Sequence, residues 1–182
     1  MQLVLYPDPI LRRRAESLKR IDDDVRKKIG EMFILMYEEH GIGLAAPQVG
    51  WSTRVFILNV GGASDQGKER VYINPVILGG SGEIVDEEGC LSLPEIRGNV
   101  RRQEKITVRA QDLDGTILEE EVSGLEARVV QHEFDHLDGI LFIQRLSTSE
   151  QLTLNPMLKN LAKKSAQSSG RSSSGGTVSS PR

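Results

Sequence analysis

The sequence predicts a single domain of the α+β class. Two long segments, 22–39 and 124–139, repeat their apolar residues at helical spacing. The segments between them alternate in polarity as strands do, and an order of helix, strands and helix is typical of mostly antiparallel α+β folds. A chain of 182 residues is long enough to bury roughly 70% of its unfolded surface in one core.

The composition excludes several classes of protein. The 23 basic and 26 acidic residues give a net charge of -3, which argues against a nucleic-acid binder held by bulk electrostatics. No apolar run reaches the length of a membrane-spanning helix. The single cysteine, Cys90, excludes an intrachain disulfide and fits a reducing compartment. We therefore expect a soluble intracellular protein whose partners include neither a membrane nor sequence-specific nucleic acid.

The first part of the chain contains an arm, a helix and a glycine-rich loop. Residues 3–14 hold two prolines ahead of a basic run and are expected to form an extended arm over the body. Residues 22–39 form a helix that begins at aspartates and that Gly41 should end. His40 is expected to cap this helix rather than to bind a metal. Residues 40–50, HGIGLAAPQVG, lack the ending of a phosphate-binding loop and leave main chain accessible to a ligand.

The middle of the chain is expected to form antiparallel strands. Pro75 falls within one strand and should lie at an edge or a bulge, because proline cannot donate to a ladder. Asp114 and Gly115 separate two other strands and are typical of a type I′ hairpin turn. The predicted strands are 54–60, 71–78, 105–110 and 116–122.

The last part of the chain is expected to contain a buried helix, a short strand, a last helix and a tail. Ser123 and Glu126 have the spacing of a capping box and Gly139 provides a stop for the buried helix. Asn155 and Pro156 have N-cap and N1 character for the last helix. The predicted regions are a strand at 140–145, a helix from 155 to about 164, a folded domain at 1–164 and a flexible Ser/Gly-rich tail at 165–182.

The buried helix carries the motif H-E-x-x-H. His132 and His136 lie one turn apart on one face and can chelate one metal ion. Glu133 lies beside that face, where a carboxylate can accept a proton from water without binding the metal. Two packed core histidines are the alternative, but burying two imidazoles beside a carboxylate is costly unless something satisfies them. The motif therefore predicts a hydrolase whose sheets pack around a central metal-binding helix.

A catalytic site of this kind usually takes three protein ligands. Phe142 stands where the extended metzincin pattern requires a histidine, and Glu150, the only later glutamate, is expected to be exposed. Cys90 lies upstream, next to Gly89. A lone cysteine is by default a small buried hydrophobe. Beside an H-E-x-x-H motif without a third histidine, its thiolate becomes the favoured third ligand.

Three ordered motifs resemble those of the peptide deformylase family. The family patterns G-φ-G-φ-A-A-x-Q, E-G-C-x-S and Q-H-E-x-D-H stand here at 41–48, 88–92 and 131–136. The resemblance runs from the N-terminal YPDPIL to about residue 164, and residues 165–182 depart from it. It implies a metal-dependent hydrolase that removes the formyl group from the N-terminal formylmethionine of newly synthesised polypeptides and releases formate.

The resemblance also implies roles for individual residues. Glu133 would accept the proton of the attacking water and deliver it to the departing amine. Gln48 and the backbone N–H of Leu91 would stabilise the oxyanion at the formyl carbon. One divalent metal ion is expected, Fe²⁺ first, with Zn²⁺, Ni²⁺ or Co²⁺ as alternatives. The implied metal ligands are Cys90, His132 and His136.

The residues around the motifs indicate how a peptide would bind. Gly43 and Gly89 expose main chain, so an extended peptide could pair with it by strand addition. Arg97 follows the second motif and could meet the peptide backbone, although a solvated arginine fits the sequence equally well. The apolar pocket for the first side chain is assigned to Ile42, Leu125 and Val129.

Three other functions stay open: a metallopeptidase that cuts internal bonds, a structural metal site in an interaction protein, and a family member acting on another formylated group. Closed structural sites bring four side-chain ligands, and the sequence offers three. The expected partners are N-formylmethionyl nascent chains, and contact of Lys159, Lys163 and Lys164 with the ribosome is left open. The expected location is a bacterial-type cytoplasm, or an organelle if a transit peptide has been removed.

Overall fold

The computed structural model describes residues 1–63, 65 and 68–171. The described helices are α1 (Asp23–Glu38), α2 (Gly124–Leu137) and α3 (Thr148–Arg171), with short 3-10 helices η1 (Pro9–Arg12), η2 (Ala46–Val49) and η4 (Phe142–Gln144). The strands are β1 (Gly43–Ala45), β2 (Val55–Leu58), β3 (Arg70–Ser81), β4 (Ile84–Cys90), β5 (Leu93–Arg102), β6 (Lys105–Gln111) and β7 (Ile117–Ser123).

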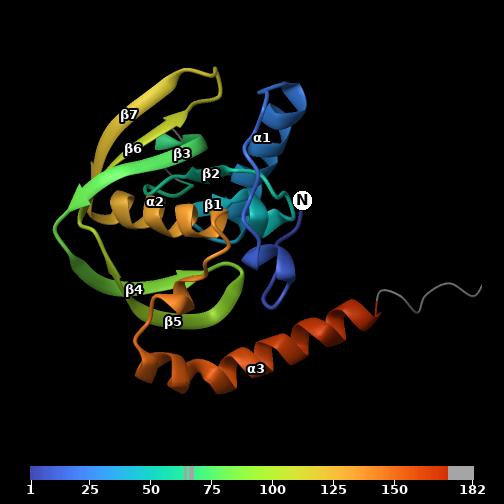
Figure 1. Cartoon of the computed structure of the whole chain (residues 1–182). Helices are drawn as coiled ribbons and strands as arrows, with labels where there is room; N and C mark the ends of the chain where they lie inside the picture. Colours follow the sequence, from blue (N-terminus) through green and yellow to red (C-terminus); the bar gives the residue numbers. More distant parts are fainter. Residues whose placement is uncertain (64, 66–67, 172–182) are drawn as a thin grey trace, which may run out of the picture.

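The strands form two separate antiparallel sheets. The larger sheet has the order β1-β2-β3-β6-β7, and the smaller sheet pairs β4 with β5. In Figure 1, α2 runs between the two sheets, α1 lies beside β1 and β2, and α3 extends beneath β5. The predicted α+β class, with mostly antiparallel sheets around a central helix, is confirmed.

Strand β2 is buried on both of its faces. Phe56 and Leu58 belong to the hydrophobic cluster that includes the inner face of α2. Val55 and Ile57 point the other way and belong to the cluster that includes α1. A third cluster joins β5 and η4 to leucines of α3. Helix α2 packs against one face of β2 and helix α1 against the other, so β2 lies between two packed layers.

Helix α1 begins as the sequence predicts and ends differently. The Asp22 carboxylate accepts a hydrogen bond from the Val25 N–H at 3.1 Å and caps the first turn. At the other end His40, rather than Gly41, takes the left-handed conformation, with φ of 56°. The Gly41 N–H then bonds to the Met36 carbonyl at 2.8 Å. His40 thus closes the helix through its backbone.

Helix α2 has the predicted extent, but the predicted capping box does not form. Ser123 is the N-cap residue, yet its side chain makes no capping hydrogen bond. Gly139 follows the helix in the left-handed conformation, with φ of 71°. A Cβ atom at Gly139 would lie 2.6 Å from the Arg12 backbone, so only glycine fits beside the N-terminal arm.

The N-terminal arm packs over the body, as predicted. The Val4 N–H bonds to the Gln48 carbonyl at 2.7 Å, and the Tyr6 N–H bonds to the Ser92 carbonyl at 2.9 Å. The arm is not extended throughout, because residues 9–12 form η1. It connects η2 to the turn between β4 and β5.

The structure corrects the prediction for the hairpin between β6 and β7. A type I′ turn needs two residues with positive φ, and here only Gly115 has one, of 81°. The Asp112 carboxylate instead accepts hydrogen bonds from the N–H groups of Asp114 and Thr116 at 2.8 and 2.9 Å. Pro75 does lie in a bulge of β3, where the register to β6 shifts.

Strands β4 and β5 were not predicted, and the strand predicted at 140–145 is wrong. Most side chains of β4 are exposed, so no apolar run marks this strand in the sequence. Leu141, Phe142 and Ile143 are buried consecutively in the third cluster. A half-buried strand would bury alternate residues, whereas these consecutive residues are buried around the start of the 3-10 helix η4.

Helix α3 begins earlier and ends later than predicted. Ser147 and Glu150 form its capping box, with the Glu150 N–H 3.3 Å from Ser147 Oγ and the Ser147 N–H 3.1 Å from the Glu150 carboxylate. Pro156 therefore lies inside the helix rather than at its start. Residues 165–171 of the predicted tail are helical, and residues 172–182 lie outside the described part of the chain.

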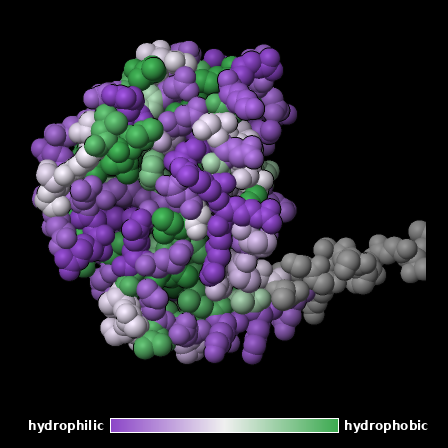
Figure 2. Space-filling model, in the orientation of Figure 1, coloured by the Kyte–Doolittle hydropathy of each residue, from purple (hydrophilic) through white to green (hydrophobic). Residues whose placement is uncertain are grey.

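Figure 2 shows a mainly hydrophilic surface with two hydrophobic areas, one over the outer strands of the larger sheet and one along the lower edge near α3. The exposed apolar side chains of the larger sheet include Val76 and Leu78 of the central strand β3 and Ile117 of the edge strand β7. Among residues 1–63, 65 and 68–171, no helix combines the length and hydropathy required to cross a bilayer.

Candidate metal centre and active site

Helix α2 presents two histidines to the interior. Because α2 packs against both sheets, His132 and His136 are buried, with 8% and 1% of their surfaces exposed. Their spacing of four residues places them on one face, with ring centroids 5.0 Å apart. Burial lowers the pKa of His136 well below its usual value and so favours the neutral ring that binds metals.

Cys90 meets these histidines from the end of β4. The pairing between β4 and β5 shifts register between Gly89 and Cys90, at the turn that leads into β5. The Cys90 Sγ atom lies 3.3 Å from His136 Nε2. One ligand atom from each of Cys90, His132 and His136 lies within 4.8 Å of the other two.

These residues fit a divalent metal ion. One sulfur and two imidazole nitrogens form a donor set that suits zinc, iron, nickel or cobalt. The His132 Nδ1 atom lies 2.8 Å from the Glu88 carboxylate, an outer contact that is typical of metal-binding histidines. Among the described residues, the buried side-chain atoms without a hydrogen-bond partner are Glu133 Oε2 and His136 Nδ1. Glu133 Oε2 lies beside the cluster, as expected for a site that receives a further group, whereas His136 Nδ1 is the ring nitrogen that does not meet Cys90.

Glu133 lies next to the cluster and is almost fully buried, with 4% of its surface exposed. Burial raises the pKa of Glu133 to about 7. Gly43 of β1 faces this carboxylate, and a Cβ atom there would lie 2.5 Å from Glu133 Oε1. The glycine therefore makes room for the carboxylate beside the metal ligands.

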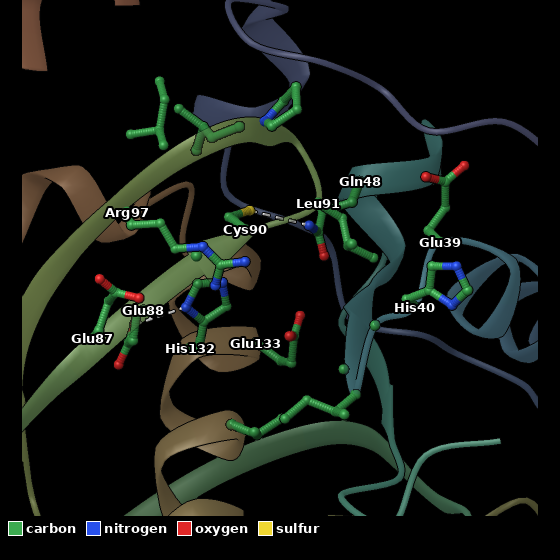
Figure 3. Close-up of a pocket in the computed structure, with 18 of the residues that line it drawn as sticks. Glu39, His40, Gln48, Glu87, Glu88, Cys90, Leu91, Arg97, His132 and Glu133 are labelled. Atoms are coloured by element: carbon green, nitrogen blue, oxygen red, sulfur yellow. Dashed lines mark hydrogen bonds and ion pairs between the residues drawn. The ribbon is translucent and has the colours of Figure 1, made fainter. Parts of the chain in front are cut away.

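Gln48 is oriented by bonds at both ends of its amide. The Ala45 N–H donates to Gln48 Oε1 at 2.8 Å, which identifies the oxygen end of the amide. Gln48 Nε2 then faces Cys90 Sγ at 3.4 Å and Ser92 Oγ at 3.3 Å. Gln48, which lies in η2, therefore directs an N–H donor toward the metal cluster. Figure 3 shows Gln48, Cys90 and His132 converging from separate elements.

A cavity of about 510 Å³ opens beside the cluster. Val129 is buried in its wall, whereas 54% of the surface of Leu125 is exposed. The Arg97 guanidinium lies against Gly89, where a Cβ atom would be 2.7 Å from Arg97 Nη1. His136 is the one candidate residue that does not line the cavity. Those that do are Ile42, Gly43, Gln48, Gly89, Cys90, Leu91, Arg97, Leu125, Val129, His132 and Glu133.

A buried network of charges beneath the cluster was missed by the sequence analysis. Glu88 accepts two hydrogen bonds from Arg102 at 2.9 Å and one from Arg128 at 2.7 Å. Burial alone would raise the pKa of Glu88, but the hydrogen bonds from His132 and Arg102 outweigh it and hold the pKa well below its usual value. Glu88 stands inside the recognised E-G-C-x-S motif. Its position beside Cys90 was the signal that could have identified it.

The comparison with known proteins agrees with this geometry. The family model described as "Polypeptide deformylase" matches residues 1–152. Peptide deformylase 1B, chloroplastic, of Oryza sativa subsp. japonica is 45% identical over 171 residues, which cover 93% of this chain. A peptide deformylase of Acidobacterium capsulatum is 48% identical over 145 residues and is matched over 85% of its length, with 80% of this chain covered.

A solved structure described as peptide deformylase from Plasmodium falciparum superposes with a TM-score of 0.86 at 39% identity. The match covers 90% of this chain and 96% of that structure. The chain spans 64% of the length of the rice relative and 59% of a second chloroplastic relative, from Solanum lycopersicum.

Proposed function

The chain belongs to the peptide deformylase family, and on this premise we propose that it hydrolyses the formyl amide of N-terminal formylmethionine and releases formate. The observation that carries the proposal is the convergence of Cys90, His132 and His136 beside the buried Glu133 carboxylate. The reaction consumes one water. A bond forms between the water oxygen and the formyl carbon, the bond from that carbon to nitrogen breaks, and the amine leaves with a proton.

Cys90, His132 and His136 would hold the metal ion, which we assign as Fe²⁺ ahead of Zn²⁺, Ni²⁺ or Co²⁺. When bound, the ion supplies a Lewis acid that polarises the formyl carbonyl and lowers the pKa of water. The Glu88 carboxylate at His132 Nδ1 fixes the orientation of that ring, so that its Nε2 faces the other two ligands.

Glu133 would carry the proton from the water to the departing amine. Its Oε2 atom is buried and has no hydrogen-bond partner in the described part of the chain, so it is available to accept a proton. Nitrogen leaves readily only as a protonated amine. The same carboxyl group is therefore proposed to return the proton after the tetrahedral stage.

Gln48 and Leu91 would stabilise negative charge on the formyl oxygen. Gln48 Nε2 is held near Cys90 Sγ, and the backbone of Leu91 follows directly after the same cysteine. Two N–H donors fixed in place before the reaction stabilise the transition state without having to reorganise.

The peptide would lie extended between β1 and β4. Gly43 of β1 and Gly89 of β4 both line the cavity, and we propose that their backbone is accessible for strand addition. Such pairing recognises the main chain of the peptide rather than its side chains, so peptides of many sequences can bind. We assign the first side chain to the apolar wall formed by Ile42, Val129 and Leu125, and contact with the peptide backbone to Arg97.

The proposed partners are N-formylmethionyl nascent chains, which fits relatives from bacteria and from chloroplasts. The proposed location is accordingly a bacterial-type cytoplasm or an organelle. We extend the proposal to a contact between α3 and the ribosome, because Lys159, Lys163 and Lys164 give the middle of the helix a basic stretch that suits phosphate.

Formate release from formyl-Met-Ala-Ser, with protein purified without oxygen, tests the activity. Glu133→Gln keeps the size of the side chain but removes its basicity, and it should lower kcat by about 100- to 10,000-fold while the metal content stays unchanged. Metal-loaded wild-type protein that releases no formate would contradict the proposal, as would cleavage of internal peptide bonds without formate.

A further inference from the structure

The three proposed metal ligands come from two parts of the fold that share no sheet. His132 and His136 lie on α2, whereas Cys90 lies at the end of β4, in the two-stranded sheet. A two-stranded hairpin alone is only marginally stable in water. The position of Cys90 relative to the histidines is therefore set by contacts of the small sheet with the rest of the molecule, and those with α2 link it directly to the histidines.

Arg128 reaches from α2 to both strands of the small sheet. It lies one helical turn before His132 and 6% of its surface is exposed. Its guanidinium donates to the Ile84 carbonyl of β4 at 3.1 Å and to the Val100 carbonyl of β5 at 3.0 Å. It also donates to the Glu88 carboxylate at 2.7 Å. A single side chain of α2 thus holds both strands.

Arg102 makes a second link, in the opposite direction. From β5 its Nη1 donates to the Asp135 carboxylate of α2 at 2.6 Å. Its Nε and Nη2 groups donate hydrogen bonds to the two carboxylate oxygens of Glu88, each at 2.9 Å. Glu88 in turn contacts His132 Nδ1 at 2.8 Å. The link therefore runs from the small sheet to two neighbouring turns of the metal-binding helix.

The charges of this network are balanced and buried. Arg102, Arg128, Glu88 and Asp135 each have at most 6% of their surface exposed, so two cations face two anions away from water. Arg145 adds two hydrogen bonds to Asp135 from the side near η4. Buried charges of this kind are tolerated only in a well-paired geometry, which makes their arrangement rigid.

We propose that Arg128 and Arg102 are positioning residues that clamp the β4–β5 sheet onto α2 and thereby fix Cys90 at bonding range of the metal held by the two histidines. The inference rests on the metal site of the proposed function. It does not depend on the substrate, because the two arginines act through Glu88, Asp135 and backbone carbonyls.

Cobalt binding tests the clamp. Arg128→Met and Arg102→Met remove the links, so Co²⁺ affinity, measured by competition with a chromophoric chelator, should fall by about 10- to 100-fold. The thiolate-to-cobalt absorption band should weaken at the same time, because Cys90 is no longer held in place. Arg101→Met is the matched control: Arg101 also lies on β5, but it pairs with Glu83 beside the same sheet and is exposed. Its Co²⁺ affinity and spectrum should not change.

Folded Arg128→Met and Arg102→Met variants with wild-type Co²⁺ affinity and spectrum would overturn the clamp. If they fail to fold, Arg128→Lys keeps the charge opposite Glu88 but cannot reach both strands at once. It should weaken Co²⁺ binding, and wild-type affinity in that variant would overturn the proposal as well. A wild-type chain that binds Co²⁺ through Cys90 but releases no formate would contradict the proposed function alone, whereas one that binds no Co²⁺ would overturn both.

Discussion

Gln48 shows how a single side chain can be oriented before any substrate arrives. The Ala45 N–H holds the amide oxygen, and the amide nitrogen consequently faces Cys90 and Ser92. Glycine has the converse role at position 43, where any side chain would meet Glu133. At the residue scale, the proposed chemistry depends on one fixed donor and on one space left free.

Replacing Gln48 by leucine keeps the volume of the side chain and removes the donor. Formate release should fall by about 100- to 1000-fold, because one hydrogen bond to the developing oxyanion is lost. Steady-state kinetics and metal analysis of the same samples measure the effect. A folded, fully metallated Gln48→Leu enzyme with wild-type kcat would remove Gln48 from the proposed role.

Replacing Gly43 by alanine places a Cβ atom 2.5 Å from Glu133 Oε1 and 2.7 Å from Val129 Cγ1. The carboxylate must shift, and kcat should drop by about 100-fold, as expected for a displacement near 1 Å. Gly79→Ala is the control, because a Cβ atom at that site of β3 meets nothing within 4 Å. Equal kcat values for the two variants would argue against a fixed position for Glu133.

At the scale of elements, α2 could be predicted and β4 with β5 could not. Helix α2 repeats its apolar residues on two faces and ends before Gly139, so local pattern defines it. Strand β4 is mostly exposed and polar, and only its pairing with β5 makes it a strand. The start of α3 was misplaced because Asn155 and Pro156 resemble a helix start as well as Ser147 and Glu150 do.

The candidate site was predictable where its residues lie within short motifs. Cys90 and the two histidines stand in short sequence patterns that indicate the proposed metal site. The clamp was not predictable, because Glu88 meets Arg102 and Arg128 across 14 and 40 residues of chain. A buried arginine has no local signature that separates it from an exposed one.

Gly139 follows α2 and Gly30 lies within α1, and replacing each by alanine should change the free energy of unfolding in opposite directions. Gly139→Ala puts a side chain at φ of 71° and against the Arg12 backbone, so the free energy of unfolding should fall by at least about 1–2 kcal/mol. Gly30 lies on the exposed side of α1 with open space around it, and Gly30→Ala should raise that free energy by about 1 kcal/mol. Urea denaturation measures both. A destabilised Gly30→Ala variant, or a tolerated Gly139→Ala variant, would contradict this packing.

At the scale of the whole molecule, the fold brings one mid-chain cysteine to two late histidines by placing a helix between two sheets. The larger sheet and α1 pack together through a shared hydrophobic cluster, and the small sheet is attached to α2 by buried charges. The N-terminal arm bonds to both the η2 loop and the turn after Cys90. Metal binding should therefore stabilise the entire fold.

Removing the metal with a chelator should abolish formate release and lower the unfolding temperature. An ion that binds only the folded state contributes about 4 kcal/mol when its concentration is 1000 times Kd. Adding Fe²⁺ without oxygen should restore both activity and unfolding temperature. In a Cys90→Ala variant the metal-dependent rise in unfolding temperature should largely disappear; a full rise there would show that the ion binds elsewhere.

The position of the bound ion tests the account most directly. Anomalous diffraction from crystals of the metal-loaded protein should show one strong peak about 2.0–2.4 Å from Cys90 Sγ and from one nitrogen each of His132 and His136. A peak that leaves Cys90 outside bonding distance, in crystals of enzyme that is active in solution, would contradict the proposed centre.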